Sequence, residues 1–238
     1  MSLQRAIVGV VATLASLVLY VISPMPLARV ELSVYDSLLP LRSAKNPSSV
    51  PVIVDIDEKT LKSVRQWPWP RYLVADLIAA LDDYNVAASG FDILFSERDN
   101  SSPSEISEYL KRDRNLDVTF EGLSPDMYDY DGLLAEKLKG SYVVLAAFAS
   151  DEGNPSPDAI PDSVNLIERA SPGAVPYAPK LYSARGGVLP MTEFRSAKLG
   201  VINIEPDADG IIRRIPLIVS MGGKIYPTLS LRTLMEAL

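Results

Sequence analysis

The chain has 238 residues, 47% hydrophobic and 22% charged, a composition that fits one large or two small domains and excludes a fully disordered chain. Its 23 basic and 30 acidic residues give a net charge of −7, which argues against a nucleic-acid-binding surface. It contains no Cys and no His. Thiol nucleophiles, imidazole bases and the common zinc sites are therefore excluded, and we predict no catalytic residue, no metal and no cofactor.

An apolar segment without charges, 6–22, follows Arg5 near the N-terminus. At about 17 residues it is just long enough to cross a membrane as a helix. A cleaved signal peptide or a buried core helix has a similar composition, but Ser23-Pro24-Met25-Pro26 is a poor cleavage site. With Arg5 on the inner side, we expect 1–25 to be a cytoplasmic stub and transmembrane anchor in the inner or plasma membrane, and 26–238 to be a periplasmic or extracellular domain.

The remaining chain alternates between helix-like and strand-like segments. Periodic apolar residues predict a membrane-proximal helix at 26–42 and further helices at 57–65, 70–84, 128–138 and 227–238, the last with Pro227 in its first turn. Apolar runs predict strands at 50–56, 86–91, 142–148, 199–204 and 211–221, the last two joined as a hairpin. This order indicates an α/β fold: a mixed, partly parallel sheet flanked by helices, with an N-terminal transmembrane helix. Because 227–238 has no stop signal, we expect it to lead towards further membrane spans.

Carboxylates and aromatic residues gather where predicted strands end or helices begin. Asp57 and Asp92 follow two strands and would meet in one crevice, as a ligand-binding or acid–base pair, or else would cap helices. In the segment Trp67-Pro68-Trp69-Pro70-Arg71, two prolines restrict the backbone at the start of a helix. These residues form either an aromatic ligand site or a packing plug, and Arg71 needs a carboxylate partner, for which Asp57 or Asp92 is the candidate.

Two D-x-D-G segments resemble the opening of a calcium loop but lack its full spacing. We predict a turn at Asp207, Asp209 and Gly210, and a helix start at Asp129–Gly132. Neither segment therefore predicts a metal site.

Five segments in this order resemble the CHASE type-2 domain, an extracytoplasmic sensory module of bacterial receptors. They are Asp36 with Arg42; 52–58, V-I-V-D-I-D-E; 67–71, W-P-W-P-R; 90–97, G-F-D-I-L-F-S-E; and 200–203, G-V-I-N, with Asp207, Asp209, Gly210 and Arg213-Arg214. The resemblance implies an input domain whose cytoplasmic output, often an adenylate or guanylate cyclase and otherwise a kinase, lies further along the receptor. It transfers no ligand to particular positions. Our ligand-binding candidates are Asp57, Trp67, Trp69, Arg71 and Asp92, and our turn or cap candidates are Asp36, Asp207, Asp209, Gly210 and Arg213.

The sequence therefore predicts a membrane-anchored sensor that forms a homodimer, responds to an unidentified small molecule or physical stimulus and binds no nucleic acid. Two alternatives stay open. In the first, the domain is an assembly module that dimerises without sensing a stimulus. In the second, it is a periplasmic hydrolase with Asp57 and Asp92 as acid and base.

Overall fold

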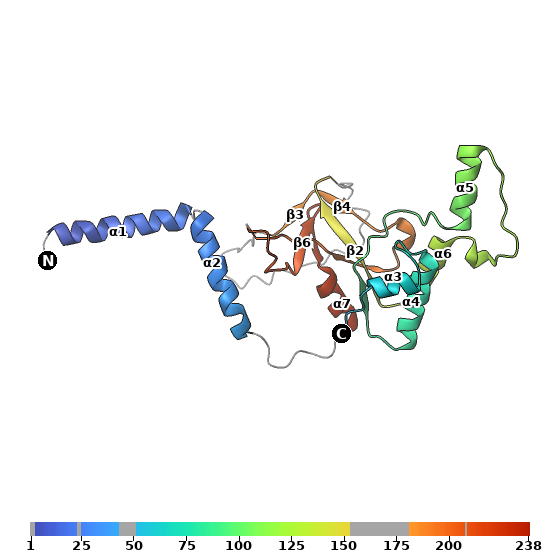
Figure 1. Cartoon of the computed structure of the whole chain (residues 1–238), viewed down its shortest axis with the longest axis horizontal. Helices are drawn as coiled ribbons and strands as arrows, with labels where there is room; N and C mark the ends of the chain where they lie inside the picture. Colours follow the sequence, from blue (N-terminus) through green and yellow to red (C-terminus); the bar gives the residue numbers. More distant parts are fainter. Residues whose placement is uncertain (1–2, 23–24, 43–50, 153–180, 208) are drawn as a thin grey trace, which may run out of the picture. The chain divides into compact units, whose positions relative to one another are not determined.

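The computed structural model describes residues 3–22, 25–42, 51–152, 181–207 and 209–238. The chain divides into two compact units, Met1–Ile56 and Asp57–Leu238, which are described separately. Figure 1 shows the elements of both units along the chain. The segment 150–187, which is rich in Pro, Gly and Ser, lies mostly outside the described residues.

The described elements of the first unit are helices. Helix α1 (Leu3–Ile22) contains the apolar window Gln4–Val21, with a mean hydropathy of 1.7, and is the one candidate membrane span among the described residues. Helix α2 (Met25–Leu38) continues into the short 3₁₀ helix η1 (Leu39–Arg42), as the sequence predicts for 26–42. The change from α to 3₁₀ coincides with Pro40, which has no backbone N–H to continue the α-helical ladder.

The predicted strand at 50–56 is wrong for its described residues. Residues 51–56 belong to no strand, and Val52, Ile53 and Val54 are 79%, 92% and 64% exposed. Their β-branched side chains suit a strand, but propensity alone does not form one. A strand also needs neighbours that cover its faces and pair with its backbone.

The second unit is built on a mixed sheet with β2 (Val143–Ser150) at its centre. Strands β1 (Ser89–Phe91) and β5 (Lys198–Val201) run parallel to β2, whereas β4 (Gly186–Val188) pairs with its end in the antiparallel direction. A smaller sheet contains β3 (Ser183–Ala184), β6 (Ile218–Met221) and β7 (Lys224–Pro227). The predicted fold class, a mixed and partly parallel α/β sheet with helices, is confirmed.

Helices cover the main sheet. Helices α4 (Arg71–Asp83) and α6 (Tyr130–Leu138) pack against each other and enclose a core that includes Phe91, Val143 and Leu145. Helix α7 (Leu229–Ala237) lies against β1, β2 and β5. Its close approach depends on Gly200, where an added Cβ would lie 2.4 Å from the Cα of Leu229. The other helices of this unit are α3 (Glu58–Ser63), α5 (Pro103–Arg114), η2 (Pro125–Met127) and η4 (Thr192–Phe194).

The predicted hairpin between 199–204 and 211–221 is wrong. β5 pairs with β2, whereas β6 pairs with β3 and β7, so the two segments belong to different sheets. The predicted turn at Asp207–Gly210 does form, and a hydrogen bond from the Gly210 N–H to the Asp207 carbonyl, at 2.8 Å, closes it. Residues 211–217 are not a strand. Pro227 is the end of β7 and not the first turn of α7, because the β6–β7 pairing includes it.

Candidate functional site

The W-P-W-P-R segment leads into α4, whose first residue is Arg71. Trp69 is buried and its indole Nε1–H donates to the Arg65 carbonyl at 2.8 Å. Trp67 is 41% exposed, and its ring centroid lies 6.0 Å from that of Trp69 at an interplanar angle of 51°. One indole therefore belongs to the packing of the domain, and the other offers an aromatic face to solvent.

Arg71 occupies the first position of α4 and is buried. Its guanidinium carbon lies 4.6 Å from the centre of the Phe95 ring, and Nη2 donates to the Glu97 carbonyl at 3.1 Å. Its Nε lies 3.5 Å from Oδ1 of Asp131. A cation at a helix N-terminus is opposed by the helix dipole, and these contacts compensate for it.

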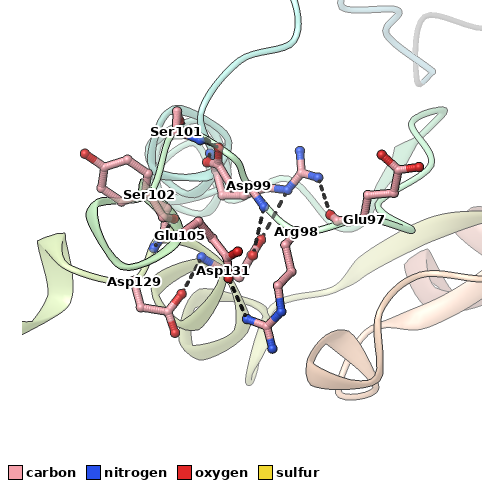
Figure 2. Close-up of polar contacts among 10 residues, drawn as sticks. Glu97, Arg98, Asp99, Ser101, Ser102, Glu105, Asp129 and Asp131 are labelled. Carbon is pink, nitrogen blue, oxygen red and sulfur yellow. Dashed lines mark hydrogen bonds and ion pairs between the residues drawn. The ribbon is translucent and has the colours of Figure 1, made fainter. Parts of the chain in front are cut away.

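Two buried carboxylates complete this cluster, which we call the Arg71–Asp99–Asp131 cluster. Asp99, in the 97–102 loop, accepts the Arg71 backbone N–H at 2.6 Å and so caps α4 from a distant part of the chain. Asp131, in α6, accepts the Asp99 backbone N–H at 2.9 Å. Figure 2 shows Asp99 and Asp131 meeting where the loop reaches the start of α6. The cluster thus joins α4, the loop and α6.

Burial dominates the electrostatics of Asp131, which is only 1% exposed. Removal from water raises the pKa of its carboxyl, while the Asp99 N–H and the Arg71 charge act in the opposite direction. Ser102 is also buried, and its hydroxyl accepts the Tyr130 backbone N–H at 3.1 Å. The loop and α6 are therefore connected twice by hydrogen bonds.

The structure does not bring Asp57 and Asp92 to Arg71 as the sequence suggested. Asp57 is the N-cap of α3 and accepts the backbone N–H and the hydroxyl of Thr60, both at 2.8 Å. The Thr60 N–H is the main reason that the pKa of Asp57 is lowered. Asp92 is exposed after β1, and within the described part of the chain no hydrogen bond or ion pair joins it to Asp57 or Arg71. The carboxylates around Arg71 are Asp99 and Asp131 instead.

The turn candidates form a second charged group, which we call the Arg213–Asp207–Asp209 turn. The side chain of Arg213 is 3% exposed; its Nη1 donates to Asp207 at 3.1 Å and its Nη2 to Asp209 at 2.7 Å. The hydrogen bond from Arg213 lowers the pKa of Asp209 to about 2. Gly210 has a positive φ of 83°, which suits glycine in this turn. Asp36 lies apart from this turn in the sequence, exposed on α2.

Sequence reasoning missed Asp99 and the role of Asp131, although one signal for Asp131 was present. Asp131 stands three and seven residues before Leu134 and Leu138, so it shares their buried helix face. Arg71 has the same relation to Val74 and Ile78 in α4. Opposite charges on the buried faces of two helices predict an ion pair wherever those helices pack together. Asp99 has no such periodic signal, because it lies in a loop.

The buried carboxylates of this region serve as hydrogen-bond acceptors within the domain. Asp57, Asp99 and Asp131 all accept hydrogen bonds from backbone N–H groups. Among the residues that the structure describes, no group of three or more acidic side chains is placed to hold a metal ion. The exposed face of Trp67 and the carboxylate of Asp92 remain accessible to a ligand.

Comparison with known proteins gives one match. The model of the CHASE2 domain family matches residues 10–238, nearly the whole chain. No curated protein and no solved structure matches it. CHASE2 domains are extracellular sensory domains of receptors and are not catalytic. Because the family model matches nearly the whole chain, including its α/β sheet, the chain belongs to the CHASE2 domain family.

Proposed function

We propose that the chain is the extracytoplasmic input domain of a homodimeric membrane receptor, anchored by α1. The observation that carries this proposal is the family match over 10–238, which includes most of the apolar helix and all of the second unit. A domain of a sensory family that follows a candidate membrane span is well suited to detect a stimulus outside the cell. The stimulus then passes through membrane helices to a cytoplasmic output.

The membrane topology is tested by cysteine labelling, for which a chain without Cys is convenient. Gln4→Cys and Ser196→Cys each introduce one thiol at an exposed position, one in each unit. In intact cells, a membrane-impermeant maleimide is expected to label Ser196→Cys and to leave Gln4→Cys unlabelled until the membrane is opened. Labelling of Gln4→Cys alone, or of neither variant in intact cells, contradicts the proposed topology.

We propose a class III adenylate or guanylate cyclase as the output. The test is a fusion of the chain, through its native membrane helices, to that output, with cyclic nucleotide production as the measurement. Trp67→Ala and Asp92→Asn remove the two accessible candidate groups and leave the buried cluster intact. If both variants and a deletion of 57–238 leave basal and stimulated output unchanged, the sensory role is wrong.

The dimer contact that we propose runs along α2. Val30, Val34 and Leu38 are spaced by four residues, and each is more than half exposed. Together with Ser33 and Ser37, Val30 and Val34 line a shallow groove on this helix. Apolar side chains on one face of a helix favour packing against another helix, and a second copy supplies an identical face.

Disulfide cross-linking tests this contact. Val34→Cys is expected to form a dimer under mild oxidation, whereas Asp36→Cys, roughly half a helical turn away, is not. Equal cross-linking of both variants, or of neither, contradicts a specific α2 contact.

The alternative proposal is an assembly module that dimerises and senses nothing. This alternative is favoured because three of the ligand-binding candidates are engaged within the domain: Asp57 caps α3, and Arg71 and Trp69 are buried. It predicts an output that depends on Val34 but not on Trp67 or Asp92. The hydrolase alternative requires turnover that Asp92→Asn abolishes, and the capping role of Asp57 does not support it.

A further inference from the structure

The Arg71–Asp99–Asp131 cluster holds unequal numbers of positive and negative groups. Arg71, Asp99 and Asp131 are 8%, 7% and 1% exposed, so one guanidinium shares a nearly dry site with two carboxyls. A net charge is costly to bury. The cluster is neutral when one of its two carboxyls carries a proton.

The hydrogen bonds distinguish the two carboxyls. Asp99 accepts three donors: the Arg71 N–H at 2.6 Å, the Ser101 N–H at 2.9 Å and the Ser101 hydroxyl at 2.6 Å. These donors occupy both of its carboxylate oxygens. From the described residues, Asp131 accepts one hydrogen bond, from the Asp99 N–H to Oδ2. Its Oδ1 and the facing Arg71 Nε, 3.5 Å apart, are both buried and make no hydrogen bond within the described part of the chain.

Apart from Arg71, the described charges near Asp131 do not neutralise it. Asp129, the N-cap of α6, accepts the Asp131 N–H at 3.1 Å and adds a further negative charge beside it. Arg98 from the 97–102 loop is directed to Glu105 of α5 and Glu193 of η4, both at 3.3 Å. The ion pair between Arg98 and Glu105 is visible in Figure 2. From α4, the one charge facing Asp131 is that of Arg71.

We propose that Asp131 is a proton-binding site in the folded domain, and that its protonation stabilises the junction of α4, the 97–102 loop and α6. Burial raises the pKa of this carboxyl, which agrees with the geometry. A group whose pKa is raised on folding adds stability below its unfolded pKa, and this stability is lost as the pH rises through the folded pKa. The junction of α4, the 97–102 loop and α6 is therefore more stable in mildly acidic medium than in neutral medium. Its use as an acid-sensing input rests on the proposed receptor function.

The absence of His makes this site unusually easy to observe. Histidine is the side chain that ordinarily titrates between about pH 5 and pH 8, and the chain has none. Ordinary Asp and Glu residues are already ionised in that range. A proton that the folded domain binds within that range therefore points to a carboxyl with a raised pKa.

The experiment uses the full chain in lipid nanodiscs, with unfolding followed by the fluorescence of Trp67 and Trp69, which lie beside Arg71 in the sequence. Between about pH 8 and pH 5, the wild type is expected to gain about 2–4 °C in Tm. Asp131→Asn is expected to lose this gain and to be at least as stable as the wild type at the higher pH. Asp76→Asn, which removes an exposed carboxylate of α4, is the matched control and keeps the gain.

If the Tm of the wild type stays constant or falls as the pH is lowered from about 8 to 5, the proposal is overturned. An Asp131→Asn variant that loses stability equally at both ends of this range also overturns it, because Asp131 is then an ordinary ionised partner of Arg71. If Asp131→Asn does not fold, the wild type alone decides. Unfolding by urea at the acidic end of this range is expected to release a proton to an indicator dye, and no release overturns the proposal. These measurements concern the proton site alone, whereas the fusion with a cyclase tests the sensory role.

Discussion

The two charged groups of the second unit have the same composition and opposite behaviour. The Arg71–Asp99–Asp131 cluster and the Arg213–Asp207–Asp209 turn each contain one guanidinium and two carboxyls. Burial raises the pKa of Asp131, whereas the hydrogen bond from Arg213 lowers that of Asp209 to about 2. The side chain of Asp209 is 23% exposed and that of Asp131 is 2% exposed. Access to water and the number of hydrogen-bond donors, and not the residue types, decide how such a group titrates.

The largest difference is expected when each guanidinium is removed. Arg71→Met leaves two buried carboxyls without their cation, and we expect the free energy of unfolding to fall by about 3–5 kcal/mol near pH 7. Arg213→Met is the matched variant and is expected to cost less, because Asp209 is open to water. Urea unfolding of the full chain in nanodiscs, followed by circular dichroism, measures both. Equal losses would show that burial does not separate the two groups.

Within the buried cluster, Asp99 is expected to stabilise the start of α4 as a cap. Asp99→Asn replaces one acceptor oxygen by an NH₂ group that faces backbone or hydroxyl donors, and we expect a loss of about 2–3 kcal/mol near pH 7. Urea unfolding again measures the loss, and Asp113→Asn, at an exposed position of α5, is the control. A loss no larger than that of the control would mean that Asp99 does not cap α4.

A buried link without charge provides a reference for both groups. The side chain of Asn203 accepts the Ala149 N–H at 2.6 Å and donates to the Ala149 carbonyl at 2.8 Å, as a neighbouring strand would. Asn203→Ala is expected to cost about 1–2 kcal/mol, because it leaves two backbone groups of β2 unpaired. This loss is expected to be the same at about pH 8 and pH 5. A strongly pH-dependent loss would contradict the assignment of pH sensitivity to the charged cluster.

The smallest effect is expected at Asp209 and appears only in acid. Its pKa is lowered from 3.8 to about 2, so its contribution to stability is complete above the unfolded pKa and is lost as the pH falls through the folded pKa. Asp209→Asn is expected to lose less stability than the wild type between about pH 5 and pH 2. Thermal unfolding followed by circular dichroism tests this, and an unchanged acid slope would count against the ion pair with Arg213.

The sequence alone determined the elements whose signals are local. The apolar run at 6–22, the apolar faces of α4 and α6 and the turn at Gly210 depend on residues close together in the chain, so periodicity and turn chemistry reveal them. The ordered motifs also indicated the family, which the match over 10–238 shows.

Only the tertiary structure decided which distant residues meet. It left the β-branched residues 52–54 outside any strand, and it separated β5 and β6 into two sheets. It also gave Arg71 the partners Asp99 and Asp131 in place of Asp57 and Asp92. Strand pairing and the pairing of buried charges both depend on long-range packing, and no local pattern in the chain specifies which surfaces come together.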